Sequence, residues 1–339
     1  MANIHAAMRR PVSPGIVSVS QNLNFSLAAI QFFANVLQFF ILPHYLLQKN
    51  MHWSLVVIPI AVLNNPFWSL IHEAIHDLFS SSSGTNVAAG RLLSLFFGSP
   101  FHVLRLTHLS HHKFNRSPLE KGTEVYDPTR SSKLRANFVY FFYIFCGLYL
   151  LEVFSTLIFF LPRASFYRLG RGLVDHGNAQ EKWLAKKFMD GKTVREIRID
   201  GIAILLIFGL SAFCYGMHWR VLVSILAMRM FLISFMDNVY HYGSTLNITT
   251  SGHNLWLPLV FSVLILNFNF HRVHHRNPAV PWRKLPELFA EHADSFDRGL
   301  LTAAVNQLRG PIPLSELINA RDANRGVKNS YRCNARLLG

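Results

Sequence analysis

Long apolar runs alternate along the chain with polar stretches rich in histidine. The apolar runs lie at about 25–43, 53–71, 138–161, 201–217, 219–236 and 254–270. A helix needs about 20 mainly apolar residues to cross the hydrocarbon core of a bilayer, and these runs are close to that length. The pattern therefore predicts an all-α integral membrane protein.

Short connections join the runs 25–43 and 53–71, and also the runs 201–217 and 219–236, so we expect four transmembrane helices in two hairpins. Each hairpin returns next to histidines. The runs 138–161 and 254–270 would then begin and end on one side of the membrane, which favours re-entrant, interfacial or buried helices. Glu152 within the first run agrees, because an unpaired carboxylate is costly at membrane depth.

Composition and charge support this organisation. Only 15% of the residues are charged, against about 25% in a typical soluble domain. The loops opposite the histidines hold only Lys49 and Arg220, whereas 30 of the 33 Lys and Arg residues lie on the histidine side. Positive charge favours the cytoplasmic side, so both termini and the histidines are predicted to be cytoplasmic. We expect no removable signal peptide.

The net charge of +15 has two interpretations. It fits attraction to anionic lipid at the membrane surface, and it also fits docking of an acidic electron carrier. Nucleic-acid binding is not expected, because the membrane topology already accounts for the basic residues.

Eight of the seventeen histidines fall into three motifs. They are "HEAIH" with His72 and His76, "HLSHH" with His108, His111 and His112, and "HRVHH" with His271, His274 and His275. In a helix, positions i, i+3 and i+4 share a face, so each H-x-x-H-H is predicted to direct three imidazoles the same way. Imidazole is a ligand for iron, zinc and copper.

The number of histidines exceeds what one ion needs. "HEAIH" by itself is typical of a zinc protease, but a catalytic zinc takes only three protein ligands. No acidic third ligand is evident in a later apolar run. Two metals that share eight or nine histidines fit better, and the second hairpin brings His241 and Asp237 to the same side.

The three motifs, together with His241, resemble those of the membrane fatty acid desaturase superfamily over about residues 50–290, and are most similar to acyl-lipid desaturases. The segment "NFNFHRVHHRNPAVPWRKLP" is similar to the acyl desaturase pattern. The resemblance implies two non-haem irons. Their ligands would be His72, His76, His108, His111, His112, His241, His271, His274 and His275. Further metal ligands, or hydrogen-bond partners of the ligands, would come from Asp237, Asn269, Glu73 and Asp77.

The resemblance also implies a reaction: O2-dependent desaturation of a fatty acyl chain or lipid, with electrons from a separate carrier such as ferredoxin or cytochrome b5. Two alternatives remain, a hydroxylase or ketolase of a lipid or carotenoid in the same superfamily, and a zinc-dependent membrane hydrolase. The expected regions are a cytoplasmic tail at 1–24, a membrane catalytic domain at 25–290 and a cytoplasmic tail at 291–339. Arg229 could pair with Glu152 or Asp237, bind a substrate head group, or satisfy neighbouring helices.

Overall fold

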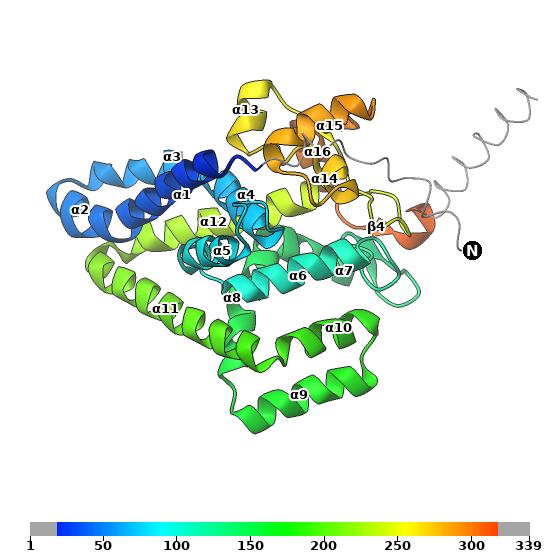
Figure 1. Cartoon of the computed structure of the whole chain (residues 1–339), viewed down its shortest axis with the longest axis horizontal. Helices are drawn as coiled ribbons and strands as arrows, with labels where there is room; N and C mark the ends of the chain where they lie inside the picture. The colour runs from blue at the N-terminus through cyan, green and yellow to red at the C-terminus, as the bar shows by residue number, and fades with distance from the viewer. Residues whose placement is uncertain (1–18, 318–339) are drawn as a thin grey trace, which may run out of the picture.

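A computed structural model describes residues 19–317. These residues are mainly helical, as the sequence predicts (Figure 1). The strands are two residues long and form two parallel pairs. β1 (Val125–Tyr126) pairs with β4 (Ile312–Pro313), and β2 (Leu255–Trp256) pairs with β3 (Arg298–Gly299). The pairs fasten the C-terminal part of the chain to loops near the histidines.

The first predicted hairpin is present. α1 (Gln21–Val36), the π-helix η3 (Leu37–Leu46) and α2 (Leu47–Lys49) form one helix of 29 residues. The chain returns through η4 (Met51–Val56), α3 (Val57–Val62) and α4 (Asn64–Ile75), with a bend of 42° between α3 and α4. The amide of Asn24 donates a hydrogen bond to the carbonyl of Phe79 at 2.9 Å. The start of the hairpin therefore lies beside the end of α4.

The second hairpin consists of α11 (Gly191–Tyr215) and α12 (Trp219–Val239), joined by η7 (Gly216–His218). Figure 1 shows the two helices meeting at the same end of the molecule as α2. Gly216 has a φ of +46°, a conformation that glycine adopts without the steric cost of a Cβ. This glycine allows the chain to reverse direction within three residues.

Arg229 on α12 binds neighbouring helices. Its guanidinium donates to the side-chain oxygens of Asn64 and Asn35, each at 2.8 Å, and to the carbonyl of Phe96. The side chain is 1% exposed. Of the alternatives that the sequence leaves open, the structure selects hydrogen bonding between helices.

Five helices lie between the hairpins in the described sequence. α5 (Ser83–Phe97) and α6 (Phe101–Phe114) meet at 102°. A continuous helix, Lys133–Phe160, follows; it consists of α7 (Lys133–Phe142), η5 (Tyr143–Gly147), α8 (Leu148–Ser155) and η6 (Thr156–Phe160). α9 (Arg163–His176) and α10 (Ala179–Phe188) complete the set.

The two apolar runs predicted to be re-entrant, interfacial or buried differ from each other. Lys133–Phe160 is one continuous helix that is long and apolar enough to span a membrane, and many of its apolar side chains are exposed, which disfavours a re-entrant or buried helix but agrees with an interfacial one or a span. The run 254–270 instead contains β2, turns and only one short helix, α13 (Leu259–Leu264). Asn267 and Leu266 have positive φ there, which a continuous helix does not allow.

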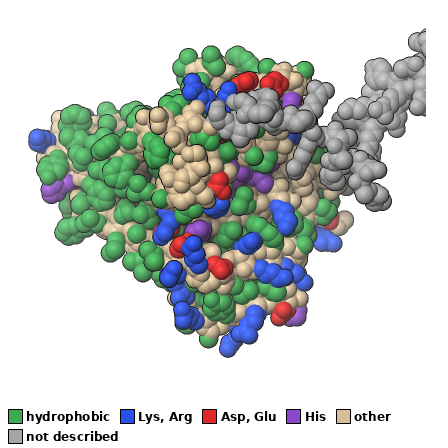
Figure 2. Space-filling model, viewed as in Figure 1, with side chains coloured by type: hydrophobic (Ala, Val, Ile, Leu, Met, Phe, Trp, Pro, Cys, Tyr) green, Lys and Arg blue, Asp and Glu red, His purple; other side chains and the backbone are tan. Residues whose placement is uncertain are grey.

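Three stretches of the described chain could cross a membrane by length and hydropathy: Gln21–Lys49, Lys133–Phe160 and Gly191–Val239. Counting each of the two bent helix pairs as one span raises the number to five. Figure 2 shows hydrophobic side chains gathered over the end of the molecule formed by α1, α2 and α3, with charged side chains gathered over the part that includes α9 and α10. This separation is typical of a membrane protein.

Residues beyond the second hairpin fold over the histidines. They form α14 (His271–Arg276), η8 (Trp282–Lys284), α15 (Leu285–Glu291), β3, α16 (Leu300–Gln307) and β4. Gln307 is fully buried, donates to the carbonyl of Phe235 at 3.1 Å and accepts from Asn238 at 2.9 Å. The part of the predicted C-terminal tail up to residue 317 is therefore packed against α12.

Candidate metal centre

Four parts of the chain deliver the nine predicted histidines to one place. α4 carries His72, and His76 directly follows the last residue of this helix. α6 carries the second motif, α14 carries the third, and His241 follows the end of α12. The structure brings all three motifs and His241 together, and their ring nitrogens form two groups with close contacts.

The first group, here called the five-histidine cluster, is His72, His76, His108, His112 and His274. Its ligand atoms all lie within 4.8 Å of one another. The Nε2 atom of His108 lies 3.1 Å from that of His76 and 3.0 Å from that of His112. The Nε2 atom of His274 lies 3.1 Å from that of His112.

The second group, here called the four-histidine cluster, is His111, His241, His271 and His275. Three of them, His111, His241 and His275, meet the same 4.8 Å criterion. His271 joins them, because its Nε2 lies 2.8 Å from that of His241 and 3.0 Å from that of His275. The two clusters adjoin where the rings of His112 and His275 stack at 4.3 Å.

The prediction that each H-x-x-H-H directs three imidazoles the same way is wrong. In both motifs the histidines at i and i+4 stay together, whereas the histidine at i+3 joins the other cluster. Thus His108 and His112 belong to the five-histidine cluster, and His111 belongs to the four-histidine cluster. In the third motif, His271 and His275 belong to the four-histidine cluster, and His274 belongs to the five-histidine cluster. The side chains of adjacent residues in a helix differ by about 100° in direction. The adjacent histidines at i+3 and i+4 can therefore each bind a different metal ion.

The donor sets fit two metal ions. For a metal–nitrogen distance of about 2.1 Å, neighbouring ligands of an octahedral ion lie about 3.0 Å apart. The close nitrogen–nitrogen contacts here are 2.8–3.2 Å. The Nε2 atom of His72 is buried without a hydrogen-bond partner in the described structure, as expected for an atom that faces a metal position.

Burial also favours the neutral form of the histidines, which is the form that binds metals. Desolvation lowers the pKa of His76 to about 3, and the nearby charge of Arg105 contributes. Desolvation lowers the pKa of His241, His274 and His275 well below the usual value, and neighbouring histidines add to the effect. These histidines are therefore neutral at neutral pH. At His111 burial also opposes protonation, but the hydrogen bond with Glu120 raises the pKa.

Two of the four additional predicted residues, Asn269 and Glu73, form hydrogen bonds to segments near the third motif. Asn269 donates to the carbonyl of Leu255 at 3.0 Å and accepts from Ser262 at 2.6 Å. The carboxylate of Glu73 accepts the backbone N–H of Trp282 at 3.3 Å. Both side chains therefore hold segments around the third motif.

The two predicted aspartates have different surroundings. Asp77, directly after His76, pairs with Arg105 at 2.7 Å. Asp237 lines a narrow cavity that also contains Glu152, Trp68 and Tyr240.

Glu120 is a site residue that the sequence did not reveal. Its carboxylate lies 2.5 Å from Nδ1 of His111 and accepts a hydrogen bond from Gln180 on α10 at 2.6 Å. A carboxylate bound to the second nitrogen of a metal-ligating histidine orients the ring and strengthens it as a ligand. Glu120 follows the second motif in an irregular loop, where no periodic pattern indicates which side chain turns back toward His111.

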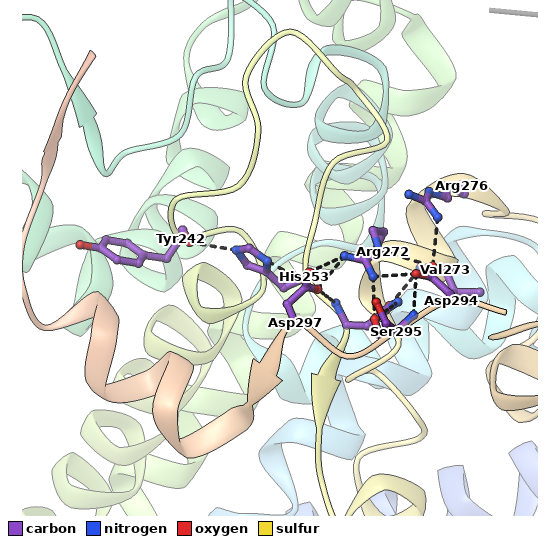
Figure 3. Close-up of polar contacts among 9 residues, drawn as sticks. Tyr242, His253, Arg272, Val273, Arg276, Asp294, Ser295 and Asp297 are labelled. Atoms are coloured by element: carbon purple, nitrogen blue, oxygen red, sulfur yellow. Dashed lines mark hydrogen bonds and ion pairs between the residues drawn. The ribbon is translucent and has the colours of Figure 1, made fainter. Parts of the chain in front are cut away.

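Arg272 fastens the helix of the third motif to the C-terminal segment (Figure 3). Its guanidinium contacts Asp294 at 2.7 Å and Asp297 at 2.6 Å. Burial opposes ionisation of Asp297, but hydrogen bonds from His253 and Arg272 lower its pKa to about 2. His253 also bonds to the carbonyl of Tyr242 at 3.0 Å, beside His241. One network therefore positions histidines from two elements.

A second anchor joins the loops that follow the second motif and His241. Arg116 and Glu124 form an ion pair in which each side chain is 1% exposed. Arg116 also donates to the carbonyls of Lys121 and Ser244. The backbone of Arg116, with a φ of +57°, accepts from the N–H of Asn247 at 2.7 Å. These contacts hold the two loops in fixed positions relative to each other.

Aromatic rings separate the clusters from the cavity that contains Asp237. Phe268 and Tyr240 line this cavity. The ring of Phe268 lies 5.0 Å from that of His72, and the ring of Tyr240 lies 5.0 Å from that of His271. The cavity therefore lies beside both clusters.

No curated protein is significantly similar to the sequence. The family model described as fatty acid desaturase matches residues 51–304. This range contains all nine histidines, Glu120 and both anchors. Since the match covers most of the chain, the protein belongs to the fatty acid desaturase family.

Proposed function

We propose that the protein desaturates a fatty acyl chain or lipid at a di-iron centre, using O2 and electrons from a separate carrier. The observation that carries this proposal is the pair of adjoining histidine clusters, with five and four imidazoles. A zinc hydrolase needs one ion with three protein ligands. Two nitrogen-rich sites favour redox-active iron instead.

The proposed reaction balances as follows. Two neighbouring methylene groups each lose one hydrogen, and a carbon–carbon double bond forms. These two hydrogens, two protons and two carrier electrons reduce one O2 to two waters. Bound iron would supply the oxidising chemistry, with the nine histidines as its ligands. The protein itself orients those ligands through Glu120 and the Arg272 network, and places the substrate chain.

The cavity beside the clusters is the proposed binding site of the substrate chain. Trp68, Phe268 and Tyr240 provide apolar walls, which bind a methylene chain by the hydrophobic effect. These rings also limit the access of water to the clusters. A rigid, dry wall would hold one part of the chain beside the metals.

The electron carrier is proposed to dock over α10, on the cytoplasmic side. His111 is 26% exposed and is linked through Glu120 to Gln180 on that helix. Lys186 and Lys187 on α10 are exposed, and positive charge would speed association with an acidic carrier such as ferredoxin or cytochrome b5. This connection gives electrons a short route to the four-histidine cluster.

The test is to measure metal content and lipid products for wild type, His274→Ala and a control, His176→Ala. His176 is exposed at the end of α9. We expect about two irons per chain and a new double bond with wild type and the control, and neither with His274→Ala.

Other outcomes would redirect the proposal. Iron with an oxygenated product would assign the enzyme to the hydroxylase or ketolase branch. Zinc with unchanged lipids would contradict oxidative chemistry altogether.

A further inference from the structure

A cleft of about 350 Å³ lies away from the cavity beside the clusters. Its cations are Lys133 at the start of α7, Arg298 in β3 and Arg309 after α16. Within residues 19–317, none of the three forms an ion pair. Glu316 is the one carboxylate that lines the cleft. The cleft therefore has excess positive charge.

Neutral hydrogen-bonding groups accompany the cations. The amides of Asn137 and Asn306 line the same cleft, as does the phenol of Tyr126. Amide N–H and phenol O–H groups donate to phosphate oxygens, and the planar guanidinium of arginine can bind phosphate through two parallel hydrogen bonds. The lining thus supplies both charge and hydrogen-bond donors for a phosphate group.

The floor of the cleft is held by buried hydrogen bonds. The hydroxyl of Tyr242 donates to the carbonyl of Gly310 at 2.7 Å, and the hydroxyl of Tyr140 donates to that of Gln307 at 2.8 Å. Gly310 has a φ of +93°, and a Cβ there would lie 3.3 Å from the side-chain oxygen of Asn137. Gly310, which follows Arg309, is thus packed closely against α7. The cleft is therefore already formed without a ligand.

Exposed apolar side chains flank the cleft on both helices. On α7, Leu134 is 81% and Phe138 is 73% exposed, and they lie one turn apart. On α16, Leu301 is 78% and Val305 is 65% exposed, at the same spacing. α7 also begins the 28-residue helix that could span a membrane. The exposed apolar side chains beside the cleft therefore extend the apolar surface that would contact lipid.

From these observations we propose that the cleft between α7 and α16 binds the phosphate head group of a membrane glycerophospholipid. The apolar side chains would enter the acyl region, while Arg298, Arg309 and Lys133 would contact the phosphate at the membrane surface. This proposal rests on the membrane setting of the proposed function and adds a lipid site apart from the metal clusters.

The test uses the full-length protein in a neutral detergent, titrated with dioctanoyl phosphatidic acid. The variant is Arg298→Gln/Arg309→Gln. The control is Arg163→Gln/Arg168→Gln, which removes two exposed arginines from α9. We expect at least tenfold weaker binding for the cleft variant than for wild type, and unchanged binding for the control. Equal melting temperatures would show that all three proteins are folded.

Two further ligands identify the source of the phosphate. Inorganic phosphate and a soluble acyl-coenzyme A are titrated in parallel. If either binds as tightly as the lipid and loses affinity in the cleft variant, the cleft takes a soluble phosphate and the lipid assignment is wrong. Equal lipid affinity of the cleft variant and the control would also overturn the proposal.

The lipid site and the proposed reaction can fail separately. Iron content and O2-dependent product formation are measured for wild type in phosphatidylcholine vesicles. An absence of product there would contradict the proposed reaction and leave the titration result intact. Product formation without selective lipid binding would contradict only the lipid site.

Discussion

The buried ion pair between Arg116 and Glu124 stabilises the loop that follows the second motif, and Arg116 also links this loop to the one that follows His241. We predict that Arg116→Met destabilises the fold and the four-histidine cluster together. The substitution leaves Glu124 without its cation in a site where each side chain is 1% exposed, and it removes a donor from the carbonyls of Lys121 and Ser244. Removing one partner of a buried pair costs about 3–5 kcal/mol.

Thermal unfolding in detergent measures this effect. For domains of this general size, 1 kcal/mol corresponds to about 2 °C or slightly more, so we expect Tm to fall by roughly 5–10 °C. The control is Glu287→Gln, because the pair of Glu287 with Lys284 is on the surface and such pairs contribute about 1 kcal/mol or less. Metal content should also fall by about one ion per chain in Arg116→Met.

A double variant distinguishes the cost of leaving the carboxylate of Glu124 unpaired from the cost of losing the packing of Arg116. Arg116→Met/Glu124→Gln removes the unpaired carboxylate, so we expect it to regain part of the lost stability, about 1–2 kcal/mol. The reasoning would be refuted if Arg116→Met melted at the temperature of the Glu287→Gln control. It would also fail if the double variant were less stable than the single one.

Three further predictions concern the site and its anchors. Glu120→Gln weakens the contact that orients His111, so we expect about 10–100-fold weaker metal binding in a titration; unchanged affinity would contradict this role. His253 and Arg272 hold the pKa of Asp297 at about 2, below its ordinary 3.8, so the ionised carboxylate stabilises the fold above about pH 4 and this contribution is lost as the pH falls through about 2. Asp297→Asn should thus melt below wild type at pH 5, with the difference vanishing near pH 2; a constant difference would refute the linkage. A chelator should lower Tm and ferrous iron should restore it, since bound metal stabilises the folded state by about 2.7 kcal/mol at 100 times Kd; no change would contradict metal binding.

Local patterns in the sequence were sufficient to predict a membrane protein of this family and to select nine histidines that lie together in the fold. Apolar runs of about 20 residues predict membrane helices, and H-x-x-H-H spacing places i and i+4 on one helix face. These rules hold whatever the rest of the chain does, so they correctly placed His72 with His76. They also placed His108 with His112, but wrongly added His111 to the same group.

Tertiary structure alone decided how the histidines divide between two clusters. His111 and His274 join histidines from other helices, and this depends on how α6 and α14 are oriented about their axes. The same applies to Glu120, which reaches His111 from an irregular loop. The 102° turn between α5 and α6 and the breaks in 254–270 likewise arise from packing. Periodicity carries no information about contacts between segments far apart in the chain, so only the fold could reveal them.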